Sequence, residues 1–230
     1  MLLMTADLNS TSCESLDTYL LCDASFVRAK AKARELRLPL QAGYVTCGSL
    51  LDAQTTAFLN AYTLGCARRG TMTVNDGQVL GAHSQYGDPV TELLLDRLRE
   101  FVEQASGLPL FPTYSYMRVY KHGDVLPAHT DRAACEISVT LAVGVQPSDP
   151  WPIQVETATG ASSVVLRPGD AMIYRAIEHV HWRNTFRGRY AVQVFLHYVD
   201  KHGPYARHRY DGRARLNYPC RLQTRSTYPE

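Results

Sequence analysis

The stretch from Tyr120 to Asp131 reads Tyr-Lys-His-Gly-Asp-Val-Leu-Pro-Ala-His-Thr-Asp. It ends with His129 and Asp131, and in an extended segment two such side chains point to the same side because side chains alternate along a strand. A further histidine, His181, follows later in the chain. Two imidazoles and one carboxylate on one face of a metal are typical of non-haem Fe(II) oxygenases and leave the opposite face open. The sequence therefore predicts that His129, Asp131 and His181 bind iron.

Alternation of apolar and polar residues predicts strands from Thr113 onward. Tyr114, Tyr116, Arg118 and Tyr120 alternate with smaller or apolar neighbours, and residues 136–143 alternate in the same way. The other predicted strands cover residues 153–156, 162–166, 171–176, 179–184 and 190–199. Between them, Arg167-Pro168-Gly169-Asp170 has proline and glycine where a type II turn requires them.

Residues from about 14 to 107 show mostly helical patterns. Helices are predicted at 23–38, at 50–68 and from Asp88-Pro89 to Gly107, where the start and stop residues suit helix ends. Residues 70–89 are polar and rich in glycine, which predicts a long surface loop.

The order of these elements predicts an α+β fold, a double-stranded β-helix (jelly roll) with N-terminal supporting helices. We expect one domain over residues 1–230, with helical support over about 1–109 and the jelly-roll core over 110–200. Residues 201–230 carry seven Lys or Arg against two acids and predict a basic, partly extended tail.

Composition is that of an ordinary globular protein, with 45% hydrophobic residues, 20% charged residues and a net charge of +2. No run approaches the roughly 20 apolar residues of a membrane helix, and the first residues lack the basic start of a secretory signal. The six cysteines are scattered without C-x-x-C pairs, which favours reduced thiols and a cytoplasmic location.

Residues 120–131 resemble the Y-x-x-G…H-x-D segment of 2-oxoglutarate/Fe(II) dioxygenases of the prolyl-4-hydroxylase type. Residues 167–174 resemble the P-G-D strand that precedes the distal histidine of that family, and 181–183 and 193–198 resemble a bacterial and phage subgroup. The resemblance covers about residues 110–200. It implies Fe(II), 2-oxoglutarate as co-substrate and O2, and hydroxylation of an aliphatic C–H bond in an amino acid, a peptidyl residue or a small metabolite.

Two late histidines compete for the third ligand position. His179 has the same parity as His181, so both could face inward. The His-Trp-Arg run favours His181, because the ligand of the resembled subgroup falls there. His179 stays an alternative, because many relatives have their co-substrate arginine ten positions after the ligand, and Arg189 stands at that distance.

A cation is needed to pair with the far carboxylate of 2-oxoglutarate, and a guanidinium can donate hydrogen bonds to both of its oxygens. Arg189 resembles the basic residue of the family but is displaced by one or two positions, so Arg118 and Arg183 are alternatives. Tyr120 matches the family tyrosine whose hydroxyl hydrogen-bonds that carboxylate.

Two other functions are compatible with the pattern. One is a cupin-type metal enzyme that uses no 2-oxoglutarate, and the other is a non-catalytic binding module that uses the basic tail. Arginines and tyrosines interleave in that tail as in some nucleic-acid-binding segments, but no nucleic-acid module is recognisable and we expect no such partner. A small-molecule or peptide substrate is expected instead.

Overall fold

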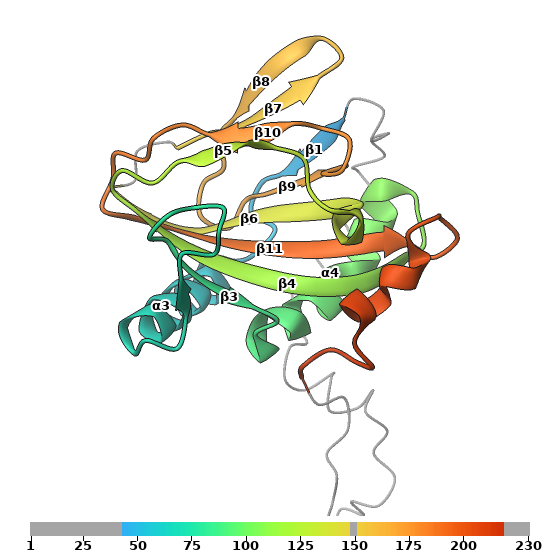
Figure 1. Cartoon of the computed structure of the whole chain (residues 1–230), viewed down its shortest axis with the longest axis horizontal. Coiled ribbons are helices and arrows are strands. Elements are labelled where there is room, and N and C mark those ends of the chain that lie inside the picture. Colours follow the sequence, from blue (N-terminus) through green and yellow to red (C-terminus); the bar gives the residue numbers. More distant parts are fainter. Residues whose placement is uncertain (1–42, 148–150, 219–230) are drawn as a thin grey trace, which may run out of the picture.

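Two antiparallel β-sheets face each other in the computed structural model, which describes residues 43–147 and 151–218 (Figure 1). In spatial order, the major sheet consists of β1 (Tyr44–Cys47), β9 (Ala171–Tyr174), β6 (Ile137–Gln146), β11 (Tyr190–Asp200), β4 (Leu110–Lys121), β3 (His83–Tyr86) and β2 (Thr73–Val74). The minor sheet consists of β5 (Leu126–His129), β10 (His181–Arg183), β7 (Ile153–Thr157) and β8 (Gly160–Val164). This arrangement confirms the predicted jelly roll.

Strand alternation gives the major sheet an apolar outer face and an inner face that carries both polar and apolar side chains. On β4, Met117 and Val119 belong to the apolar core that includes the helices, whereas Tyr116 and Arg118 face the space between the sheets. Figure 1 shows α3 (Ala53–Arg68) and α4 (Pro89–Ser106) on the side of the major sheet away from the minor sheet. The helices therefore cover the outer face, and the inner face is left for a site.

Both described α-helices begin at an aspartate that caps the helix, and α4 also ends at a glycine. Asp52 and Asp88 are the N-caps of α3 and α4, and the Asp88 carboxylate accepts hydrogen bonds from the backbone N–H groups of Val90 and Thr91. Helix α4 ends at Gly107, whose φ of 73° is in the left-handed region that favours glycine. The predictions of helices at 50–68 and after Asp88 are confirmed.

The predicted strands of the second half all occur, with boundaries shifted by a few residues. The Arg167–Asp170 turn is also present, because the Asp170 N–H donates to the Arg167 carbonyl at 2.8 Å and Gly169 has a φ of 95°. This turn leads into β9, which lies between β1 and β6.

The prediction of a plain surface loop over residues 70–89 is wrong. Two short strands, β2 and β3, form the edge of the major sheet there, and β3 pairs with β4. The region before residue 110 also contributes β1, so it is not purely helical. Strands β2 and β3 have few apolar residues, and Ser84 is their only buried residue, so their sequences lack the alternation that reveals a half-buried strand.

The described part of the basic tail, residues 201–218, is folded rather than extended. It contains the 3₁₀ segment η4 (Ala206–Gly212), and Arg213 forms an ion pair with the buried Glu92 of α4 at 2.6 Å. Tyr218 donates a hydrogen bond to Asp96 at 2.6 Å. These are single long-range contacts, which leave no periodic pattern in a sequence.

Some predictions lie outside the described residues, among them the helix at 23–38. Cys66 and Cys135 are buried and form no disulfide within the described residues. Neither described helix is long and apolar enough to cross a membrane.

Loss of the α4 cap should destabilise the protein. The Asp88 carboxylate is buried and also accepts hydrogen bonds from Tyr62 and Gln85. We expect Asp88→Ala to lower the free energy of unfolding by about 2 kcal/mol, because N-cap removal leaves helix N–H groups unpaired. Urea denaturation measures this. The exposed Gln104 on the same helix is the control, and Gln104→Ala should change the value by no more than about 0.5 kcal/mol. Equal effects of the two substitutions would contradict the assigned cap.

Candidate metal centre

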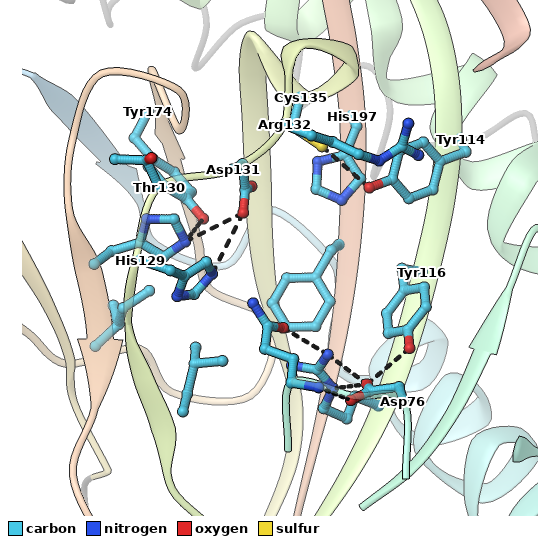
Figure 2. Close-up of a pocket in the computed structure, with 16 residues that line it drawn as sticks. Asp76, Tyr114, Tyr116, His129, Thr130, Asp131, Arg132, Cys135, Tyr174 and His197 are labelled. Carbon is cyan, nitrogen blue, oxygen red and sulfur yellow. Dashed lines mark hydrogen bonds and ion pairs between the residues drawn. The ribbon is translucent and has the colours of Figure 1, made fainter. Parts of the chain in front are cut away.

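His129, Asp131 and His181 converge between the two sheets. Strands β5 and β10 pair antiparallel with His129 opposite His181, and Asp131 lies two residues after the end of β5. The Nε2 atoms of His129 and His181 lie 3.4 and 3.7 Å from Asp131 Oδ1 (Figure 2). One donor atom from each residue lies within 4.8 Å of the others, so the three side chains could hold one metal ion.

Backbone carbonyls fix both histidine rings. His129 Nδ1 lies 2.7 Å from the Pro127 carbonyl oxygen, and His181 Nδ1 lies 3.0 Å from that of His179. Because a carbonyl only accepts, each Nδ1 carries a proton, and each Nε2 lies on the Asp131 side, where it can bind a metal when it is unprotonated. Metal-binding histidines are oriented in this way by an outer hydrogen bond. The donor set therefore fits a divalent metal before any ion is bound.

Burial and charge set the protonation of these groups. Burial opposes ionisation of Asp131, but the hydrogen bond from His129 and the positive potential of the nearby histidines outweigh it and lower the pKa of Asp131. Burial lowers the pKa of His181, whereas the hydrogen bonds of His129 to Asp131 and Pro127 outweigh burial and raise its pKa. Near neutral pH this gives an anionic carboxylate and a neutral His181, the states that metal binding requires.

A cavity of about 380 Å³ opens beside the three residues. Figure 2 shows Tyr114, Tyr116 and His197 on the wall opposite His129, and Asp76 below Tyr116. The other residues that line the cavity are Gln78, Arg118, Leu126, Thr130, Arg132, Cys135, Ile153, Tyr174 and Phe195. Its volume is in the range of small-molecule sites.

Arg118 lines this cavity, but its guanidinium is already paired. It forms a buried ion pair with Asp76 at 2.5 Å and donates to Gln78 Oε1 at 2.8 Å. Its Nη1 donates to the hydroxyl of the buried Tyr120 at 3.0 Å. Since Tyr120 accepts this bond, its own hydroxyl proton remains available to another acceptor.

Arg183 is a buried cation that forms no ion pair with any carboxylate of the described chain. It donates to the Trp151 carbonyl at 2.6 Å and lies 3.4 Å from Gln193 Oε1, and its Nε has no partner. Burial lowers the pKa of Arg183, while the neighbouring Tyr120 and Tyr174 favour its charged form. A buried, incompletely bonded guanidinium is costly unless an anion joins it.

Two site residues predicted from the sequence, Arg189 and His179, do not line the cavity. Arg189 is exposed at the start of β11, whereas Arg183 is buried, and neither side chain lines the cavity. His179 Nδ1 lies 2.9 Å from the Glu156 carbonyl oxygen, and the imidazole packs against Gly43, away from the three converging donors. The structure thus brings His181, and not His179, to His129 and Asp131.

Sequence reasoning missed four polar residues of the cavity wall, Asp76, Gln78, Cys135 and His197. His197 could have been found, because it has the same parity as Gln193 and Phe195 on β11 and must share their face. Asp76 and Gln78 lie in the region between helices and have no such signal.

No protein-family model matches the chain, and no curated protein matches its sequence. Solved structures do match its fold. A prolyl-4-hydroxylase from Pseudomonas putida superposes with a TM-score of 0.61 at 20% identity, over 75% of this chain and 98% of that one. The alpha-ketoglutarate-dependent epimerase SnoN from nogalamycin biosynthesis gives a TM-score of 0.63 at 16% identity, over 74% and 84%. A complex of SnoN with Fe³⁺, alpha-ketoglutarate and a nogalamycin compound gives 0.58 at 15% identity, over 76% and 84%. The chain shares the fold of these enzymes.

Removing the carboxylate that pairs with Arg118 should destabilise the protein. Both side chains of the Asp76–Arg118 pair are almost fully buried, at 8% and 5% exposure. We expect Asp76→Asn to lower the free energy of unfolding by about 3–5 kcal/mol, because it leaves a buried guanidinium without a counter-charge. Denaturant unfolding measures this loss. Glu178→Gln, which breaks the more exposed Arg175–Glu178 pair, should cost less than about 1 kcal/mol. A comparable loss in both variants would be inconsistent with the buried pair.

Proposed function

We propose that this protein is an Fe(II)- and 2-oxoglutarate-dependent oxygenase that hydroxylates an aliphatic C–H bond. The observation that carries the proposal is the convergence of His129 Nε2, His181 Nε2 and the Asp131 carboxylate beside an open cavity. With iron and 2-oxoglutarate bound, the centre would supply the oxidation of a substrate C–H bond by O2, with succinate and CO2 as co-products.

His129, Asp131 and His181 would hold the metal from one side only. Their carbonyl-anchored rings need little rearrangement, so the site is preorganised for a divalent ion. The side facing the cavity carries no further protein ligand from this set, which leaves room for co-substrate and oxygen.

Arg183 would pair with the far carboxylate of 2-oxoglutarate. It lies two residues after His181 on β10, so both side chains point to the same face of the strand. A carboxylate there would gain a charge-assisted bond from the unpartnered Nε of Arg183 and a second bond from the free hydroxyl proton of Tyr120. Thr140 Oγ1, on the inner face of β6, is also buried without a partner and could donate to the same ligand.

Arg118 and Arg189 suit this role less well. The charge of Arg118 is already balanced by Asp76, and the guanidinium of Arg189 is exposed to water. In the proposed arrangement Arg118 instead orients Tyr120, by donating to its hydroxyl oxygen.

The substrate would be an amino acid, a peptidyl residue or a small metabolite. The cavity wall combines the rings of Tyr114, Tyr116 and Phe195 with polar groups, which suits one side chain or one small molecule. The similarity to a prolyl-4-hydroxylase and to an enzyme solved with a nogalamycin compound supports both kinds of substrate.

Anaerobic titration of the metal-free protein with Fe(II) and then 2-oxoglutarate tests this function. We expect the weak visible charge-transfer band of a chelated 2-oxo acid on iron, and we expect His181→Ala to abolish it by removing a ligand. His179→Ala should retain the band, because that imidazole is directed at Glu156. A folded wild-type protein that binds Fe(II) but gives no band would instead favour the metal enzyme that uses no 2-oxoglutarate.

The same titration tests the role of Arg183. Loss of a bond to a charged group costs about 1.5–3 kcal/mol, so Arg183→Gln should raise the Kd of 2-oxoglutarate roughly tenfold to a hundredfold. Affinity for Fe(II) alone should stay close to that of the wild type. Arg189→Gln is the matched control and should leave both constants unchanged. The opposite result, with weakening only in Arg189→Gln, would move the co-substrate carboxylate to the start of β11.

A further inference from the structure

Asp131 belongs to a second group of potential metal ligands. Cys135 lies at the end of the 3₁₀ segment η3 (Ala133–Cys135), and His197 lies on β11. One donor atom from each of Asp131, Cys135 and His197 lies within 4.8 Å of the others. In Figure 2 Asp131 stands between His129 on one side and His197 with Cys135 on the other. The carboxylate is therefore shared by two clusters of donors.

The His197 ring is held by an outer hydrogen bond, as are the other two histidines. Its Nδ1 lies 2.8 Å from Ser138 Oγ. Ser138 has one proton, which it can donate to His197 Nδ1, to the Cys135 carbonyl, 3.2 Å away, or to Asp131, 3.5 Å away. When that proton is directed at the carbonyl or at Asp131, Nδ1 donates to Ser138 and Nε2 keeps a lone pair. His197 is 6% exposed, so this lone pair belongs to a buried ring whose orientation is fixed.

The Cys135 sulfur lies beside a hydroxyl group that could stabilise it as a thiolate. The Sγ atom lies 3.1 Å from the hydroxyl of Tyr114, which could donate to the sulfur once the thiol loses its proton. The guanidinium of Arg132, which is paired with Asp211 at 2.7 Å, lies 4.5 Å from the centre of the Tyr114 ring. Burial and the neighbouring Asp131 raise the pKa of the Cys135 thiol, so the sulfur keeps its proton until a metal ion binds. Cys135 is only 1% exposed, but it lines the cavity together with Asp131 and His197. A cation that enters the cavity can reach all three donors.

We propose that Asp131, Cys135 and His197 form a second metal site, suited to a borderline cation such as Zn²⁺. Sulfur, imidazole and carboxylate are the usual zinc donors, whereas the cluster of His129, Asp131 and His181 contains no sulfur. On binding, the Cys135 thiol releases its proton and a metal–sulfur bond forms. Because Asp131 serves both sites, zinc in the second site weakens the binding of iron in the first. The two sites together make the protein sensitive to zinc.

Cobalt(II) is the probe for this site, because thiolate ligation gives an intense near-ultraviolet charge-transfer band. We expect the band when the metal-free full-length chain is titrated anaerobically with Co(II), and we expect His181→Ala, which lacks a donor of the first cluster, to keep it. Cys135→Ser should abolish the band, and His197→Phe should weaken cobalt binding at least tenfold while keeping an aromatic ring against Tyr114. Cys66→Ser, which changes a buried cysteine of the outer core, is the matched control and should keep the band.

Added Zn²⁺ should also raise the Kd of Fe(II). This increase should be at least tenfold larger in the wild-type protein than in Cys135→Ser. A cobalt-saturated wild type without the thiolate band, or a band that persists in Cys135→Ser, would overturn the proposal. This proposal rests on the proposed function in one respect, because it takes Asp131 to be a ligand of iron. Failure of that function would appear separately, as the missing iron–2-oxoglutarate band with the cobalt–thiolate band still present.

Discussion

The antiparallel pairing of β5 with β10 is the constraint on which the candidate centre depends. It places His129 directly opposite His181, so residues far apart in the sequence present two imidazoles on one face of the minor sheet. A shift of one residue in this register would turn one ring to the other face. The hydrogen bond from the Asp131 N–H to the Ala176 carbonyl, at 2.9 Å, then holds the carboxylate beside both rings.

The interior of the roll contains charged side chains beside its apolar clusters, and not every charged side chain has a partner of opposite charge. Arg118 has a carboxylate partner in Asp76, whereas the equally buried Arg183 has none among the described residues. An unbalanced buried charge is tolerated where a ligand of opposite charge joins it, so the asymmetry between the two arginines favours an anion-binding role for Arg183. The outer face of the major sheet needs no ligand to balance a charge, because the helices pack against it through an apolar core.

Sequence periodicity predicted the regular secondary structure of this protein. The strands of the second half and the starts of the two helices follow from alternation and helix-end residues. The choice of His181 beside His129 and Asp131 came from the family resemblance, because His179 has the same parity. Periodicity could not predict β2, β3 or the packing of residues 201–218, because these depend on single long-range contacts such as Arg213 with Glu92. For the arginines, resemblance favoured Arg189, but burial depends on where β11 enters the roll, and the sequence does not contain that information.

The central claim is that one metal ion binds between β5 and β10. The most direct measurement is the anomalous diffraction of an anaerobic crystal loaded with Fe(II), recorded at wavelengths on both sides of the iron absorption edge. The account predicts a single strong iron peak within bonding distance of the His129 and His181 Nε2 atoms and of the Asp131 carboxylate. An iron peak bound by other residues, or no peak in a crystal of protein saturated with iron, would contradict it.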